Sequence, residues 1–206
     1  MRSLRLMDST QPNVLLIPNF YSDHTVLFKI LLSSVQWDTT MAARYTASFG
    51  EPYNYSQMAY PATPMHSALK PVATALFHTL GISFNNCLLN YYVTGQSTMG
   101  FHSDETKDLQ PSTGVAIISL GYPRDITYKH KIDHDNQHSF TLTPGSLLYM
   151  DGAVQDNWLH GIKKQKNAGS RISVTWRAFR KASYYWLYYD SSLLLNDYQP
   201  TCPANF

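Results

Sequence analysis

The sequence predicts an α+β fold that is mainly β, in which two helices precede a β-sandwich or barrel. Short strand-like segments follow one another closely between residues 86 and 177, separated by Gly, Pro and polar residues. This spacing is typical of sandwiches and barrels. Apolar residues also recur at helical spacing in two segments before Gly81. A chain of 206 residues is expected to form a single domain, 1–206.

The first half of the chain is predicted to contain one strand, two helices and a pair of short strands. These lie at 14–17 (strand), 23–34 (helix), 44–64 (two short strands with turns) and 67–80 (helix). Asp23 is a candidate N-cap for the first helix, and Gly81 is a candidate end for the second. The tyrosines of segment 44–64 either pack within the fold or form a stacking surface for a nucleobase.

The second half is predicted to contain six strands, at 86–92, 115–120, 125–130, 138–142, 145–150 and 171–177. The second of these is apolar on both faces, which predicts a buried strand, whereas the last alternates strictly between polar and apolar residues. The tail from Ala182 is rich in tyrosine and leucine and is expected to lie outside this set of strands.

Composition narrows the class of protein. The net charge is only +2, so the overall charge does not by itself indicate a nucleic-acid-binding protein. Cys87 and Cys202 do not make a disulfide framework and suit a reducing compartment. No apolar run approaches the ~18 to 20 residues that a membrane span needs, and no apolar segment of a secretory signal follows the N-terminus. We expect an intracellular monomer of the nucleus or cytoplasm with no membrane partner.

The sequence His102-x-Asp104 is a candidate metal-binding motif. Side chains two apart on a strand point to one face, so these two can bind the same ion. A second histidine would complete the 2-His-1-carboxylate triad of non-haem Fe(II) sites. His160 is favoured because its rivals lie in or beside a polar segment expected to form an exposed hairpin turn. Those rivals are His130, His134 and His138.

Four further polar residues suit a small dicarboxylic acid beside that metal. Arg171 and Arg177 are predicted to point to one face of a strand, opposite an apolar face. A guanidinium can hold a carboxylate through two parallel hydrogen bonds. Asn90 and Tyr92 share a face of an earlier strand and can bind a keto acid. Together these residues indicate oxidation that depends on Fe(II), 2-oxoglutarate and O2. A zinc site or a non-catalytic binding module would not need the arginine pair.

Five motifs together resemble the AlkB family of Fe(II)/2-oxoglutarate-dependent dioxygenases, particularly its repair members. They are Asn90-x-Tyr92, His102-x-Asp104, segment 143–150, segment 155–160 and the pair Arg171 and Arg177. Residues 44–55 are also similar to that family's aromatic nucleotide-recognition lid. The resemblance covers roughly residues 14–179.

The resemblance implies a double-stranded β-helix (jelly roll) core at 86–179. N-terminal helices and the nucleotide-recognition lid would occupy 14–85, and a C-terminal extension would occupy 180–206. Iron would be bound by His102, Asp104 and His160. The distal carboxylate of 2-oxoglutarate would be held by Arg171, and Arg177 would lie near its metal-bound end. Asn90 and Tyr92 would complete the cosubstrate pocket.

The resemblance also implies oxidative demethylation of N-alkylated bases, such as 1-methyladenine and 3-methylcytosine, in DNA or RNA. A duplex substrate would require the base to be flipped out of the stack. Tyr55, with Tyr53 nearby, would stack on that base, and Glu105 would lie near its exocyclic amine. The family more usually carries Phe or Trp at the stacking position, so the substrate stays open.

Contacts to the rest of the nucleic acid are expected from other segments. Phosphates would be bound by Arg44, Lys163, Lys164 and Lys166, or by Lys129 and Lys131. Segment 35–37 would supply an intercalating finger if the substrate is a duplex. The alternative is a dioxygenase of the same fold that acts on another substrate, such as a protein, a lipid or a regulatory RNA modification.

Overall fold

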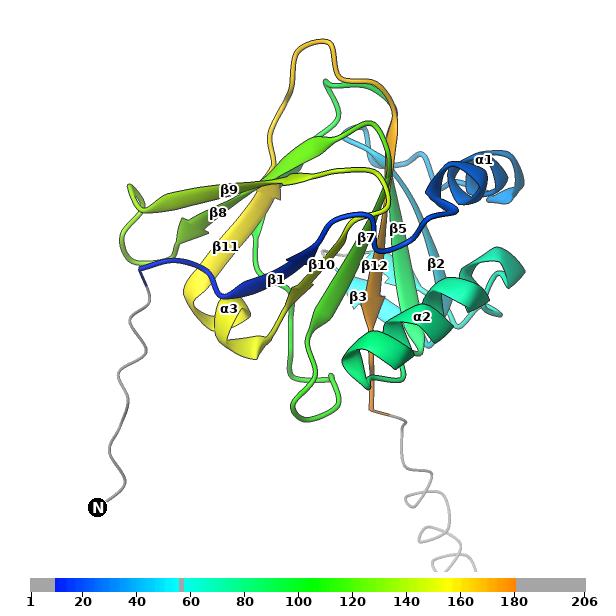
Figure 1. The fold of residues 1–206 in the computed structure, drawn as a ribbon, viewed down its shortest axis with the longest axis horizontal. Coiled ribbons are helices and arrows are strands. Elements are labelled where there is room, and N and C mark those ends of the chain that lie inside the picture. Colours follow the sequence, from blue (N-terminus) through cyan, green and yellow to red (C-terminus); the bar gives the residue numbers. More distant parts are fainter. Residues whose placement is uncertain (1–9, 56–57, 181–206) are drawn as a thin grey trace, which may run out of the picture.

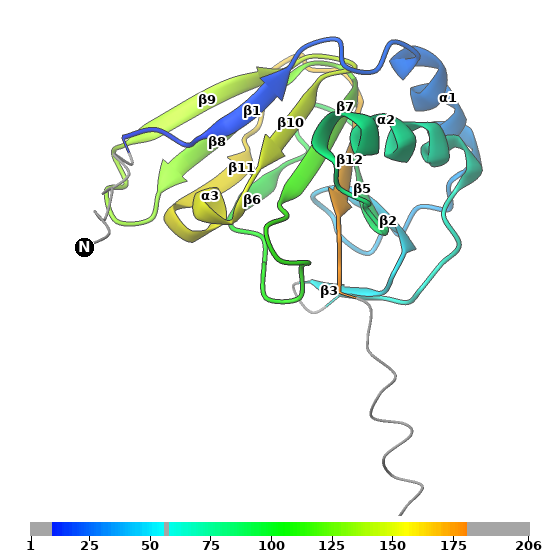
Figure 2. The ribbon, with the colours of Figure 1, turned by 60° about the horizontal axis from the view of Figure 1, so that its bottom comes forward.

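The computed structural model describes residues 10–55 and 58–180, apart from the side chains of Asn54, Tyr55 and Met58. Two antiparallel sheets face each other, and two helices cover the outer face of the larger sheet (Figures 1 and 2). The larger sheet has the strand order β1-β10-β7-β12-β5-β2, and the smaller has the order β6-β11-β8-β9. This is the jelly-roll arrangement that the resemblance implied.

The larger sheet consists of β1 (Val14–Ile17), β10 (Leu147–Met150), β7 (Val115–Gly121), β12 (Arg171–Arg177), β5 (Asn86–Tyr92) and β2 (Tyr45–Gly50). The smaller sheet consists of β6 (Met99–His102), β11 (Trp158–Ile162), β8 (Arg124–His130) and β9 (Gln137–Leu142). A separate hairpin pairs β3 (Tyr53–Tyr55) with β4 (Met58–Tyr60). The helices are α1 (His24–Ser34), α2 (Lys70–Leu80) and the short α3 (Gly152–Asn157).

Strand β12 shows how alternation separates the core from the site. Ile172, Val174 and Trp176 are fully buried and belong to the apolar cluster that α1 and α2 cover. Burial of each such side chain stabilises the fold by about 1.5–3 kcal/mol. Because successive side chains of a strand point to opposite faces, Arg171 and Arg177 point into the space between the two sheets. The prediction that the arginines oppose a core-like face is confirmed.

The two predicted long helices are present with small differences. Asp23 occupies the N-cap position of α1, but its side chain makes no capping hydrogen bond. The second predicted helix begins as a short 3₁₀ turn, Ser67–Leu69, before α2. Gly81 ends α2 with φ at 68°, a left-handed conformation that glycine adopts without steric cost. Within the described residues no helix is both long and apolar enough to cross a bilayer.

Some elements differ from the sequence-based expectation. Segment 44–64 holds three strands, because β2 joins the edge of the larger sheet and only β3 and β4 form a separate hairpin. The elements β6, α3 and β11 were not predicted as regular structure. All three are short and lie next to the site described below. Cys202 and the tail after residue 180 lie outside the described residues.

Candidate active site

Three potential metal ligands converge where β6 and β11 pair. His102 ends β6 and lies directly opposite His160 of β11, with ring centroids 4.4 Å apart. Asp104 follows two residues after β6. The ligand atoms of the three residues all lie within 4.8 Å of one another, and the described part of the chain contains no other such group. The structure therefore favours His160 over its three rivals as the third ligand.

The rival histidines make other contacts around the turn between β8 and β9. His130 accepts a hydrogen bond from the main-chain N–H of Asp133 at 3.1 Å. The other two lie against main-chain carbonyl oxygens: His134 against Lys131 and His138 against Thr10. This agrees with the expectation of a polar turn.

Gly161 allows the two ligand-bearing strands to approach each other. A Cβ atom at this position would lie 2.9 Å from the main-chain oxygen of Met99 on β6. The strand register also shifts between His160 and Ile162. A larger residue would push β6 away, so glycine helps to keep His102 and His160 as neighbours.

Protonation states at the site suit a divalent metal ion. Burial lowers the pKa of His160 to about 4, so this imidazole is neutral at neutral pH. Burial acts to raise the pKa of Asp104, but Arg177 and the two histidines outweigh it and lower this pKa to about 2. Nδ1 of His102 lies 3.0 Å from the main-chain oxygen of Gly100, which suits an Nδ1–H donor and Nε2 as ligand. A neutral His160 imidazole beside an ionised Asp104 carboxylate fits Fe(II).

Arg177 connects the metal ligands to the inner face of the larger sheet. Its Nη2 donates a hydrogen bond to Oδ1 of Asp104, and both side chains are buried. The ring of Tyr53 lies over its guanidinium, 4.5 Å from the ring centroid to Cζ. Tyr53, Asn90 and Arg177 line one cavity together with the three metal ligands.

Arg171 forms a second cationic position on the same face of β12. Its Nε donates to Oγ of Ser119 at 2.9 Å, and Cζ lies 5.1 Å from the ring centroid of Tyr92, which it pairs with in register. Its buried Nη1 has no hydrogen-bond partner among the described residues. A buried guanidinium whose Nη1 lacks an acceptor can bind an anion, and the two oxygens of a carboxylate match its geometry.

A buried polar row lies between the two arginine positions. Its members occupy paired positions on β2, β5, β12 and β7, and they are Thr46, Asn90, Ser173 and Ser119. Oδ1 of Asn90 accepts a hydrogen bond from Nε of Arg44 at 2.8 Å. Polar groups buried in a core are costly unless they are paired, so this row marks the inner face as a surface for a polar ligand.

The predicted substrate-binding residues agree less well with their expected roles than the predicted metal ligands do. Arg44 is buried against Asn90, so its placement does not fit the expected phosphate contact. Glu105 is exposed, pairs with Lys107 at 2.7 Å and does not line the metal ligands' cavity. Tyr53 is buried and stacks with Phe179, whereas the side chain of Tyr55 lies outside the described residues.

Several residues of the site were missed from the sequence. Ser119 is a polar residue within the apolar run 115–120, and Ser173 alternates with the arginines, so both carried a signal. Gln155 contacts Asp104 and begins the motif segment 155–160, but the motif by itself assigned it no role. Arg124 is fully buried and binds main-chain carbonyls of three loop residues, which are Thr94, Ser97 and Lys163.

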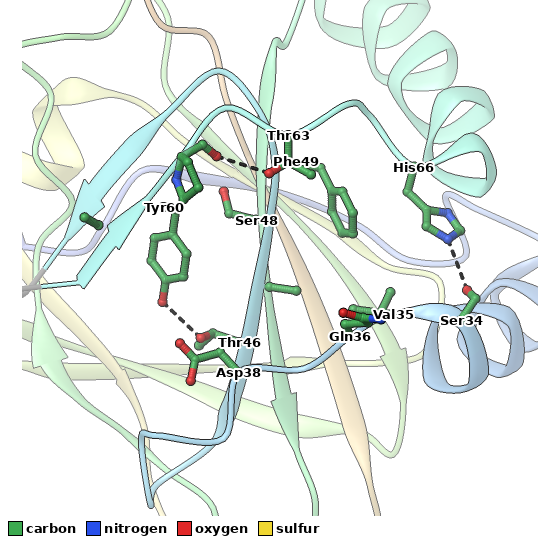
Figure 3. Close-up of a pocket in the computed structure, with 13 residues that line it drawn as sticks. Ser34, Val35, Gln36, Asp38, Thr46, Ser48, Phe49, Tyr60, Thr63 and His66 are labelled. Atoms are coloured by element: carbon green, nitrogen blue, oxygen red, sulfur yellow. Dashed lines mark hydrogen bonds between the residues drawn. The ribbon is translucent and has the colours of Figure 1, made fainter.

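A pocket of about 470 Å³ opens at the edge of the larger sheet, between the end of α1, β2 and β4 (Figure 3). The Tyr60 hydroxyl donates to Oγ1 of Thr46 at 3.0 Å inside it. Its lining includes Gln36 and Ser48 but no metal ligand, lysine or arginine. This pocket therefore adjoins both the segment expected to form a finger and the segment expected to form a lid.

Paired antiparallel sheets with a His-x-Asp…His site and two inward arginines define the class of Fe(II)/2-oxoglutarate-dependent dioxygenases. A model of the 2OG-Fe(II) oxygenase superfamily matches residues 8–177. The DNA oxidative demethylase ALKBH2 of Arabidopsis thaliana is 32% identical over 133 residues, which are 53% of this chain and 42% of that protein. Human alpha-ketoglutarate-dependent dioxygenase alkB homolog 3 is 29% identical over 150 residues, 68% of this chain and 52% of that protein.

The fold is also similar to the solved structure of OsALKBH1, with a TM-score of 0.58 and 20% identity over 81% of this chain and 98% of that one. The chain belongs to the 2OG-Fe(II) oxygenase superfamily and, within it, to the AlkB family. It spans about half the length of the curated relatives that it matches.

Proposed function

We propose that this protein demethylates N-alkylated bases, such as 1-methyladenine and 3-methylcytosine, in DNA or RNA. The single observation that carries the proposal is the cluster of His102, Asp104 and His160 beside the inward-facing arginines of β12. The similarity to proteins named as a DNA oxidative demethylase and an alkB homolog supports the choice of substrate.

The side chains between the sheets would bind and orient the cosubstrate. Arg171 would hold the distal carboxylate of 2-oxoglutarate, because its Nη1 lies buried in need of an acceptor. Arg177 and Asn90 would contact the keto acid end, since both line the cavity of the metal ligands. Bound Fe(II) supplies the chemistry that couples O2 and 2-oxoglutarate to hydroxylation of an N-methyl group. The overall reaction would convert 2-oxoglutarate into succinate and CO2 and would release the methyl group as formaldehyde.

Access to the site favours a single base rather than an intact duplex. The metal ligands Asp104 and His160 are buried, so a methyl group on a paired base edge cannot reach them without flipping. A methylated base that cannot pair is already easier to extrude by a few kcal/mol. In this proposal the hairpin β3-β4 and the pocket at the edge of β2 would hold the rest of the nucleic acid (Figure 3).

Phosphate contacts would come from one lysine on β8 and one that directly follows β11. Nζ of Lys129 lies 4.8 Å from the ring centroid of Phe101, and Nζ of Lys163 lies 5.4 Å from the same centroid. Two cations and an aromatic ring so close together suit a strand with a charged backbone and stackable bases.

The experiment is formaldehyde release from short oligonucleotides that carry one 1-methyladenine or 3-methylcytosine, prepared as DNA and as RNA. Purified protein with Fe(II), ascorbate and 2-oxoglutarate should release formaldehyde, and omission of 2-oxoglutarate should abolish it. The DNA-to-RNA ratio ranks the substrates. Succinate without formaldehyde would instead indicate a dioxygenase of the same fold with another substrate. A reaction that forms neither succinate nor formaldehyde would contradict the proposal.

A further inference from the structure

Gln155 is a buried amide that connects two segments of the site. It lies on α3, five residues before His160, and only 3% of its surface is exposed. Helix α3 begins at its N-cap Asp151, whose Oδ1 accepts a hydrogen bond from the N–H of Val154 at 3.1 Å. Nζ of Lys131 donates to the main-chain oxygen of Gln155 at 2.7 Å and fixes the other side of the turn. The side chain of Gln155 therefore projects from a well-supported position.

Two hydrogen bonds join this amide to Asp104. Oε1 of Gln155 accepts from the main-chain N–H of Asp104 at 2.8 Å, and Nε2 donates to Oδ2 of Asp104 at 3.4 Å. A main-chain N–H can only donate, so it must face the amide oxygen. The amide NH₂ must then face the carboxylate. The orientation of the Gln155 amide is thus set by its partners.

Asp104 needs this support because it does not belong to a strand. It follows the end of β6 in an irregular segment, whereas His102 and His160 are held by direct strand pairing. Its Oδ1 receives the hydrogen bond from Arg177. Its Oδ2 receives the weaker bond from Gln155 and lies 3.7 Å from Nε2 of His160. Gln155 therefore holds both the backbone of Asp104 and the carboxylate oxygen nearest to the third ligand.

We propose that Gln155 is a positioning residue of the metal site, which fixes the backbone and the rotamer of Asp104 for ion binding. This role of Gln155 rests on one part of the proposed function, which is that the site binds a divalent metal ion. Hydrogen-bond partners of metal ligands typically change metal affinity by about 10- to 100-fold when they are removed. A similar loss is expected here, because the ligand that loses its support is the single carboxylate of the set.

The test is binding of Co²⁺ to the full chain, followed by its visible absorption spectrum. Gln155→Met keeps the length of the side chain and removes both hydrogen bonds. It should weaken Co²⁺ binding about 10- to 100-fold and alter the absorption bands of the bound ion. The matched control is Asn157→Ala, an exposed residue of the same helix whose side-chain amide donates to the main-chain oxygen of Ala153. The control should bind Co²⁺ like the wild type.

A purely structural role predicts a different result. A lower melting temperature of Gln155→Met with unchanged Co²⁺ affinity and spectrum would overturn the proposal. If that variant does not fold, Gln155→Asn replaces it, because the shorter amide cannot reach Asp104, and weaker binding is again expected. Wild-type protein that binds Co²⁺ but releases no formaldehyde with Fe(II) would refute the demethylase and leave this role intact. Wild-type protein that binds no Co²⁺ would overturn it.

Discussion

The pair formed by Arg177 and Asp104 allows a quantitative test of the site in the metal-free protein. Both side chains are buried, and Nη2 of Arg177 donates directly to Oδ1 of Asp104. Arg177→Met leaves the carboxylate in the interior without this cation. Removal of one partner of a buried ion pair typically costs about 3–5 kcal/mol of folding stability. We expect Arg177→Met to lie in this range, because Gln155 and His160, which also face the carboxylate, lie farther from it.

The assay is urea unfolding in the presence of a metal chelator, arranged as a double-mutant cycle. Asp104→Asn should also be costly, since it leaves the Arg177 guanidinium buried without an anion. The double variant removes both charges and should lose much less than the sum of the two single losses, with a coupling energy of about 1–3 kcal/mol. Lys164→Met, which removes an exposed charge, should change stability by less than about 0.5 kcal/mol.

Additive losses in the two single variants would refute the reasoning, because they would show that the two charges do not stabilise each other. The slope of unfolding free energy against urea must stay constant for the comparison to hold.

Three further predictions follow from other residues of the site. Arg171→Met should raise the KM for 2-oxoglutarate by about tenfold or more, consistent with the loss of a charge-assisted hydrogen bond of about 1.5–3 kcal/mol, while oligonucleotide affinity is unchanged; equal losses in both would contradict its role. The native pKa of His160, about 4, lies below its ordinary value, so between about pH 6.5 and 4 the unfolded chain binds a proton that the folded chain does not, and the free energy of unfolding should fall on acidification through that window by on the order of 3 kcal/mol. In the presence of a metal chelator, His160→Gln should lose this pH dependence in acid unfolding curves. A curve like that of the wild type would count against the assignment to His160. Lys129→Ala and Lys163→Ala should each weaken oligonucleotide binding and reduce the slope of log affinity against log salt by about 1 in fluorescence anisotropy; an unchanged slope would exclude a phosphate contact.

Strand periodicity made much of the fold predictable from the sequence. The strict alternation of β12 predicted which face carries Arg171 and Arg177, and the structure confirms it through the buried Trp176 on the other face. Gly81 predicted a helix end because its left-handed conformation suits glycine. These features depend on local geometry, which a short stretch of sequence specifies.

The features that were missed depend on contacts between distant segments. β6 and β11 are short and irregular strands, and the position of His160 follows from their pairing and from Gly161. Arg44 was expected to contact phosphate, but Asn90, 46 residues away, accepts its hydrogen bond in the interior. The resemblance placed Glu105 near the base, yet neighbours in an irregular segment need not share a direction, and this side chain is exposed and pairs with Lys107.

The central claim is that the three metal ligands and the arginines of β12 form one centre that couples 2-oxoglutarate turnover to base demethylation. The most direct measurement quantifies succinate and formaldehyde in the same reaction on a 3-methylcytosine oligonucleotide, with the wild type and with folded His160→Ala. The wild type should give the two products in equal amounts, and the variant should give neither. Formaldehyde that persists in the variant, or that forms without 2-oxoglutarate, would contradict the claim.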